Sequence, residues 1–352
     1  MVWWQVILFP LAILWDGITR FRNHLFNIES TPSFDFEANV IGVGNLAVGG
    51  TGKTPMVMYL ADHFLSQDKQ VAILSRGYRR STRGLRMATE DDTAKTLGDE
   101  SFMYWKRYRD QGVMVAVAEE RAWAIPWILA EQPGNDVILL DDAFQHRSVT
   151  PTLNLLLTHW NRPFFRDFVM PSGRLRERRA NAQRADLIAV TKCPPKLTDR
   201  EMSSCDEEIA HYAKSSTLYT AVDYGSITPI FDAVPRVPGA FVAVAGLASS
   251  SDFRHWCEHH HQLVHFMAFP DHHRYTARDV RRIRQFLSPE VGLLTTEKDA
   301  VKLEMFRELQ DFGCFYVPIK VRFLRGEDLL LTMIERSFVD YDRELSEEGK
   351  DN

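Results

Sequence analysis

Residues 40–55 read VIGVGNLAVGGTGKTP and decide the fold class. A short apolar run leads into a glycine-rich loop, and a helical pattern follows the GKT triplet, which is the context of a phosphate-binding P-loop. Glycines let backbone N–H groups turn toward phosphate oxygens, Lys53 can reach the β- and γ-phosphates, and the Thr54 hydroxyl can bind Mg²⁺. The strict pattern has glycine where this chain has Ala47, so we expect the next two glycines to supply the turn. The predicted ATP-binding residues are Ala47, Val48, Gly49, Gly50, Thr51, Gly52, Lys53 and Thr54.

A second nucleotide-binding element reads DVILLDDAFQHR (136–147). Four apolar residues end in Asp141 and Asp142, at the carboxyl edge of a predicted strand. A parallel sheet places that edge beside the P-loop, where a carboxylate can hold Mg²⁺ directly or through water. Alone, this pattern is equally that of a strand ending in a polar turn. Together, the two elements predict a nucleoside triphosphatase, and they leave open which aspartate binds the metal directly.

Short, continuously apolar segments surround these elements and predict buried parallel strands joined by helices. They lie at 40–43, 71–74, 113–117, 137–140, 153–157 and 187–190. A second set follows at 241–248, 263–269, 291–295 and 315–321. We therefore predict an α/β protein: a P-loop NTPase-type domain with a mostly parallel sheet, and a smaller second α/β domain.

The predicted organisation has five parts. They are an N-terminal membrane-anchor helix (1–26), the P-loop domain (36–217), an extended connector (218–238), the second α/β domain (239–338) and a disordered tail (339–352). The connector is rich in turn residues and aromatics, and the tail is polar and charged.

Composition restricts the classes of function. The 352 residues carry a formal charge of −5, which gives no global reason to expect nucleic acid as a partner. The four cysteines form no CxxC pair, so they indicate neither a disulfide framework nor a cysteine-based zinc site. His255 and His259 have helical metal-pair spacing, but no further ligand pattern completes a site. No obligate protein partner is evident.

The N-terminus is strongly apolar. Residues 2–15 read VWWQVILFPLAILW, and Arg20 and Arg22 follow this run. The run is shorter than the ~20 residues of a spanning helix, and it lacks the leading basic residues of a secretory signal. Its tryptophans favour the membrane interface. We expect a membrane-surface partner here, and leave open whether the helix spans the bilayer or lies in the interface.

The order and spacing of eight segments resemble the tetraacyldisaccharide 4'-kinases of lipid A synthesis over nearly the whole chain. They are GNLAVGGTGKTP (44–55), LSRGYRR (74–80), GDES (98–101), LLDDAFQHR (139–147), PSGRLRE (171–177), VTK (190–192), FPDHHRYT (269–276) and TEKDAVKL (296–303). The resemblance implies transfer of the ATP γ-phosphate to the 4'-hydroxyl of a tetraacylated glucosamine disaccharide 1-phosphate. It also implies a location on the cytoplasmic face of the bacterial inner membrane.

The resemblance makes Asp99 the catalytic carboxylate, although an aspartate before a helix is as readily an N-cap. A histidine of the second domain would complete a dyad with it. We choose His272, and the His272–His273 doublet leaves His273 open. The residues expected to bind the acceptor are Asn45, Arg76, Arg121, Arg176 and Glu177.

The alternative function is a membrane-associated P-loop ATPase switch. Such proteins carry a second lysine just before the glycine doublet, where this chain has Val48. The VTK triplet (190–192) lacks the aspartate of a guanine-binding motif, which favours ATP over GTP.

Overall fold

The computed structural model describes residues 3–231 and 236–348, and it contains two separate β-sheets. The larger sheet has nine strands in the order β14-β8-β7-β6-β1-β5-β2-β4-β3. Its inner pairs are parallel, while β3 and β14 pair antiparallel at the two edges. The strands are β1 (Asn39–Asn45), β2 (Val71–Ser75), β3 (Arg86–Met87), β4 (Met114–Val117), β5 (Val137–Asp141), β6 (Leu153–His159), β7 (Leu187–Thr191), β8 (Ser216–Tyr224) and β14 (Ile319–Arg325).

Helices cover both faces of this sheet because its strands are apolar on both sides. Adjacent residues point to opposite faces, so Ile41 and Val40 belong to different core clusters. Helices α2 (Lys53–Leu65), α4 (Asp99–Tyr108) and α10 (Glu327–Glu348) pack on the first face. Helices α5 (Arg121–Glu131) and α6 (Asp199–Ala210) contribute to the clusters that include the second face. Short segments complete this part, namely α3 (Ala94–Leu97), η1 (Arg109–Gln111), η2 (Phe164–Arg166) and η3 (Arg179–Arg184).

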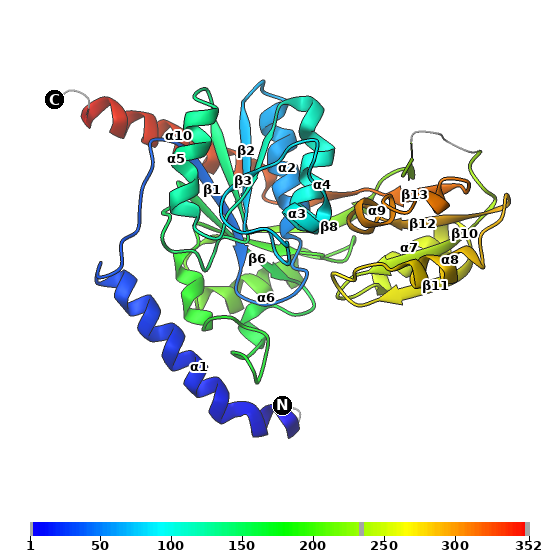
Figure 1. Cartoon of the computed structure of the whole chain (residues 1–352). Helices are drawn as coiled ribbons and strands as arrows, with labels where there is room; N and C mark the ends of the chain where they lie inside the picture. The colour runs from blue at the N-terminus through cyan, green and yellow to red at the C-terminus, as the bar shows by residue number, and fades with distance from the viewer. Residues whose placement is uncertain (1–2, 232–235, 349–352) are drawn as a thin grey trace.

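The second sheet has five strands in the order β11-β10-β12-β13-β9 and lies beside the first domain (Figure 1). Only the β13–β9 pair is antiparallel. Helices α8 and α9 pack on one face and α7 on the other. The elements are β9 (Thr228–Pro229), β10 (Ala240–Gly246), α7 (Ser251–His260), β11 (Gln262–Phe269), α8 (Ala277–Arg284), β12 (Val291–Thr296), α9 (Glu297–Leu303), η4 (Arg307–Leu309) and β13 (Cys314–Val317).

The structure places the chain between the domains differently from the sequence prediction. Part of the predicted connector at 218–238 forms strands: residues 218–224 belong to β8, an inner strand of the first sheet, and residues 228–229 form β9, an edge strand of the second. Residues 232–235 lie outside the described residues. The predicted strand 315–321 is two strands, because Pro318 has no N–H to donate to a ladder. Its second half, in β14, returns to the first sheet.

The second domain is therefore an insertion between β8 and β14. The two crossings are adjacent, since the Gly225 N–H donates to the Pro318 carbonyl at 2.8 Å. After the insertion, α10 packs on the first domain through Leu330 and Ile334. The backbone of α10 is helical as far as Glu348, so residues 339–348 differ from the predicted disordered tail. Residues 349–352 lie outside the described residues.

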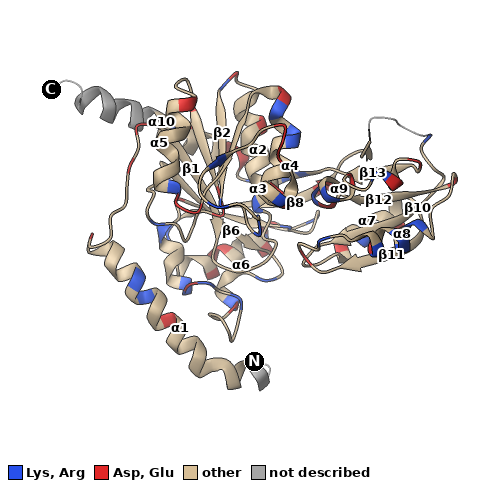
Figure 2. Cartoon of the chain, viewed as in Figure 1, with Lys and Arg blue, Asp and Glu red and all other residues tan. Residues whose placement is uncertain are grey.

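Helix α1 (Trp3–Asn27) extends along one side of the first domain (Figure 1). It carries few charged residues (Figure 2). Several of its apolar side chains are exposed, including Ile7 and Phe21 at 65% and Ile13 at 61%. Within residues 3–231 and 236–348, no helix combines the length and apolar character needed to cross a membrane.

Candidate active site

The loop between β1 and α2 has the shape that a P-loop requires. Gly49 and Gly52 have φ angles of 113° and 84°, which side chains disfavour, so the glycines permit the turn. Asn45 is fully buried and donates from Nδ2 to the Thr51 hydroxyl at 2.7 Å. The loop is also fixed from outside, because the Val48 N–H donates to the Arg174 carbonyl at 2.8 Å. The predicted residues 47–54 thus form one preorganised loop and the first turn of α2. Asn45, which is expected to bind the acceptor, instead supports the loop from within.

Asp141 and Asp142 follow β5 directly beside this loop, because Asp141 pairs with Val43 in the parallel register. Nζ of Lys53 lies 3.3 Å from Asp142 Oδ1, and a guanidinium nitrogen of Arg176 lies 2.8 Å from Asp142 Oδ2. Asp142 has a φ of 52°, which turns its carboxylate toward these cations. The predicted nucleotide-binding and carboxylate elements therefore meet, and Arg176 joins them.

The two carboxyl groups differ in charge state. Burial, the negative charge of Glu100 and that of Asp142 raise the pKa of Asp141 to about 7. Burial also acts to raise the pKa of Asp142, but Lys53 and Arg176 outweigh it and hold that pKa well below its usual range. Asp142 is therefore ionised and already paired. Oδ1 of Asp141 and Oδ1 of Asp142 are both buried and accept no hydrogen bond. The Asp142 oxygen has Lys53 beside it, whereas the Asp141 oxygen has no such partner among the described residues.

Arg121 does not reach the open part of the site. Its side chain is fully buried, and it donates hydrogen bonds to the backbone carbonyls of Asp141 and Asp142. Burial lowers the pKa of this guanidinium to about 10, so it still carries its charge at neutral pH. Its contacts position the end of β5, which differs from the acceptor-binding role expected from the sequence.

Asp99 and His272 meet across the boundary between the domains. Asp99 begins α4, and Nδ1 of His272 lies 3.4 Å from its Oδ2. His272 has a φ of 56°, and Tyr78 packs edge-on against its ring at 5.1 Å. His273, by contrast, faces Asp279 at 3.1 Å within the first turn of α8. Of the two histidines, the structure brings only His272 to Asp99.

Two lysines of α9 surround this pair, and the sequence reasoning missed both. Nζ of Lys298 lies 3.2 Å from His272 Nε2, 3.2 Å from Asp271 and 3.1 Å from Glu100. Lys302 lies 3.5 Å from Asp99. An ammonium group can only donate, so Nε2 accepts, and a neutral His272 carries its proton on Nδ1, facing Asp99. Both lysines lie in the TEKDAVKL segment (296–303), which supports the family resemblance. The segment alone assigns neither lysine a role.

Asp99 is ionised in this setting. Burial acts to raise its pKa, but His272 and Lys302 outweigh burial and lower it overall. Its neighbour Glu100 acts electrostatically on Asp141, so the Asp99 side of the site adjoins the end of β5.

The remaining predicted residues occupy different places. Arg76 is exposed, and its charge contributes to lowering the pKa values of buried Arg121 and His146, so it lies near both. Glu177 is 2% exposed and accepts hydrogen bonds from Asn23 of α1 and from Arg184. Glu177 therefore joins α1 to the P-loop domain instead of facing an open surface.

Comparison with known proteins agrees with this geometry. The family model of tetraacyldisaccharide-1-P 4'-kinase matches residues 4–338. Tetraacyldisaccharide 4'-kinases of Flavobacterium psychrophilum and Cytophaga hutchinsonii are 37% and 34% identical, over 91% and 97% of this chain and 93% and 97% of theirs. The crystal structure of an "apo" form of LpxK from Aquifex aeolicus in complex with ATP matches with a TM-score of 0.73 and 30% identity, covering 95% of this chain and 99% of that one. The chain belongs to the tetraacyldisaccharide-1-P 4'-kinase family.

Proposed function

We propose that this chain transfers the γ-phosphate of ATP to the 4'-hydroxyl of a tetraacylated glucosamine disaccharide 1-phosphate. The observation that carries this proposal is the meeting of two half-sites. Lys53 and Asp142 pair at the phosphate loop, and Asp99 faces His272 across the domain boundary. Glu100 links the halves, because it acts on Asp141 and contacts Lys298. Membership of the kinase family supports this function over an ATPase switch.

The phosphate loop binds the nucleotide. Its glycine-rich backbone and the start of α2 orient N–H groups toward phosphate oxygens. Lys53, now paired with Asp142, is the cation for the transferred phosphate, and Arg176 is a second cation at the same carboxylate. Placing positive charge where negative charge develops is the main demand of phosphoryl transfer.

The residues also fit a magnesium ion. The described residues contain no group of three or more His, Cys, Asp and Glu side chains that would form an all-protein metal cage. Mg²⁺ with a nucleotide needs only one or two carboxylates, and the unpartnered Oδ1 of Asp141 supplies one. Asp141, Asp142 and the Thr54 hydroxyl would hold the ion, with Asp141 as the direct carboxylate ligand because Asp142 is already paired. An ion held there would supply positive charge that offsets the negative charge of the phosphates.

Asp99 acts on the acceptor hydroxyl. It is an ionised carboxylate, and the Nδ1–H of His272 and the ammonium of Lys302 face it. These contacts fix its orientation, so that it can accept a hydrogen bond from the hydroxyl and take the proton as the phosphate arrives. A loose transition state requires only modest proton withdrawal, which suits a carboxylate of low basicity.

Helix α1 holds the enzyme at the cytoplasmic face of the inner membrane. Several of its polar groups contact the protein: Trp15 donates to the Arg176 carbonyl at 3.0 Å, Asn23 donates to Glu177 at 2.9 Å, and Asp16 pairs with Arg178. Its exposed apolar side chains, such as Ile7 and Ile13, point elsewhere. A helix with polar groups on the protein and apolar side chains on its exposed surface is typical of the membrane interface. A helix in that position brings a lipid substrate beside the site.

The test is incubation with γ-labelled ATP and the purified acceptor in detergent micelles. The expected result is a labelled lipid that forms only when acceptor is present, with little release of inorganic phosphate. Acceptor-independent release of phosphate, with no labelled lipid, would support the ATPase switch instead.

A further inference from the structure

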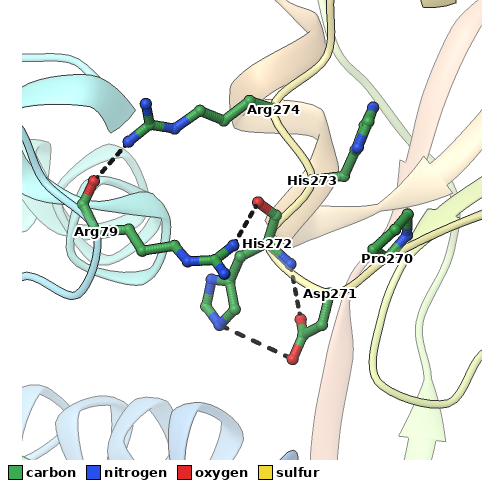
Figure 3. Close-up of a pocket in the computed structure, with 6 residues that line it drawn as sticks. All are labelled: Arg79, Pro270, Asp271, His272, His273 and Arg274. Carbon is green, nitrogen blue, oxygen red and sulfur yellow. Dashed lines mark hydrogen bonds and ion pairs between the residues drawn. The ribbon is translucent and has the colours of Figure 1, made fainter.

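A cavity of about 440 Å³ lies between Arg79 of the first domain and residues 270–274 of the second (Figure 3). One of its lining residues is His272, which contacts Asp99. Of that pair, only His272 lines it, and no residue of the phosphate loop 47–54 does. The cavity therefore adjoins His272 and lies outside the phosphate loop. Its lining residues are Arg79, Pro270, Asp271, His272, His273 and Arg274.

Two arginines, one from each domain, give this cavity its character. Arg79 donates to the His272 carbonyl at 3.4 Å, and Arg274 donates to the Arg79 carbonyl at 2.8 Å. Both side chains are exposed, and within the described residues neither has an ion pair with a carboxylate. A guanidinium carries five N–H donors, and these contacts use one from each. The remaining donors are open to a ligand, and guanidinium groups match phosphate oxygens well.

The other ionisable groups in the lining are already paired. Asp271 accepts from the backbone N–H of His272 at 3.0 Å and lies 3.2 Å from Lys298, so its negative charge is offset. His273 is paired with Asp279. The backbone of Arg79, with a φ of 60°, is in the left-handed region, as is that of His272, which faces it. Two residues of the cavity lining thus have backbone conformations of a kind that often occurs at functional sites.

We propose that Arg79 and Arg274 bind the phosphate that the acceptor already carries at its 1-position, so that this cavity is the phosphate subsite for the lipid. The inference rests on the proposed function and deepens it. An acceptor with a hydroxyl at one end and a phosphate at the other needs a cationic subsite beside, and not within, the reacting centre. A cavity that shares only His272 with the dyad meets that requirement. Binding there orients the disaccharide and selects acceptors that bear the phosphate.

The experiment compares two acceptors, the disaccharide 1-phosphate and its 1-dephospho form, with wild type, Arg79→Gln, Arg274→Gln and the double variant. Wild type should have a higher kcat/KM for the phosphorylated acceptor, by about tenfold to a hundredfold, which is the range for charge-assisted hydrogen bonds. Each variant should lose most of that preference, because its kcat/KM should fall much more on the phosphorylated acceptor than on the dephospho acceptor. Arg282→Gln on α8 is the matched control, because it removes an exposed second-domain charge that does not line the cavity.

The outcomes separate the subsite from other roles. Equal losses on both acceptors would mean that the arginines only hold the domains together, and would overturn the proposal. A wild type that shows no preference between the acceptors would also overturn it, while leaving the kinase function intact. Failure to phosphorylate either acceptor would count against the proposed function itself. Anionic phospholipid added to the micelles tests whether the cavity binds a membrane headgroup. If this lipid changes the rate of wild type but not that of the Arg79 and Arg274 variants, and no preference between the acceptors is seen, the cavity binds a membrane headgroup and not the substrate.

Discussion

Nδ1 of His272 lies 3.4 Å from Oδ2 of Asp99, although the two residues belong to different domains. Neither domain alone contains the pair, so the contact depends on how the domains are held together. Lys298 contributes to this, because it contacts both Glu100 of α4 and His272. The Asp99–His272 pair therefore forms only where the two domains meet.

The dyad predicts a specific pattern of kinetic losses. Asp99→Ala should lower the rate of the chemical step by about 10²–10⁴-fold, with a smaller effect on ATP affinity. His272→Ala should lower it less, and the double variant should be little worse than Asp99→Ala, since the two act as a unit. Single-turnover kinetics on the lipid acceptor measures these rates. Fully multiplicative losses would show that the two residues act independently.

Two further variants control for the backbone and for the choice of histidine. His272→Asn keeps a residue that tolerates the left-handed backbone, and its amide N–H can still face Asp99, so it should retain more activity than His272→Ala. His273→Ala should lose less activity than His272→Ala, because His273 faces Asp279. The reverse order would assign the role to His273.

Lys53 should be indispensable for turnover but not for folding. Its Nζ is the proposed cation for the transferred phosphate, and Asp142 keeps Arg176 as a partner when Lys53 is removed. Lys53→Ala should lower kcat by at least about 10²–10³-fold, with little change in melting temperature. Near-normal turnover by a folded variant would contradict the assignment of the phosphate loop.

Membrane attachment and structural support by α1 can be separated. The triple variant Ile7→Gln, Ile13→Gln and Phe21→Gln changes only exposed side chains, so it should leave the membrane fraction without a change in melting temperature. Deletion of residues 1–25 should also release the protein. It removes the contacts of Trp15 and Asn23 as well, so its melting temperature should fall. Sedimentation with vesicles measures the first effect. Retention of the triple variant on membranes would place the anchor elsewhere.

The lowered pKa of Asp99 gives stability a defined dependence on pH. The folded-state pKa lies below the unfolded value of about 3.9, so the ionised form stabilises the fold above that pH. The contribution is lost as pH falls through the folded-state pKa. The difference in free energy of unfolding between wild type and Asp99→Asn should therefore shrink as the pH falls below about 4. Urea unfolding at several acidic pH values tests this, and a difference that does not shrink below about pH 4 would contradict it.

Much of the first domain could be predicted because its signals are local. Continuous apolar runs mark buried strands, and the glycine-rich loop and the Asp141–Asp142 pair follow two of them. Parallel pairing then brings them to one edge of the sheet. In the structure, Val43 of β1 pairs with Asp141 of β5, as this prediction requires.

The rest depended on contacts between distant segments. Nothing near Arg121 in the sequence shows that its guanidinium is buried under the end of β5. His273 contacts Asp279 in the first turn of α8, and this contact distinguishes it from His272. Lys298 has a role only because the second domain lies against α4. Strand β14 follows Pro318 so closely that its return to the first sheet has no separate signal in the sequence.

Because the second domain is inserted between β8 and β14, these two paired strands are synthesised at well-separated times. When β8 leaves the ribosome, its partner β14 and the covering helix α10 have not yet been made. The edge of β8 and the apolar face that receives Leu330 and Ile334 stay uncovered while the whole insert, residues 228–317, emerges. Exposed strand edges and apolar surface favour aggregation. The nascent chain therefore needs protection longest at the face of the nucleotide domain that its last helix covers.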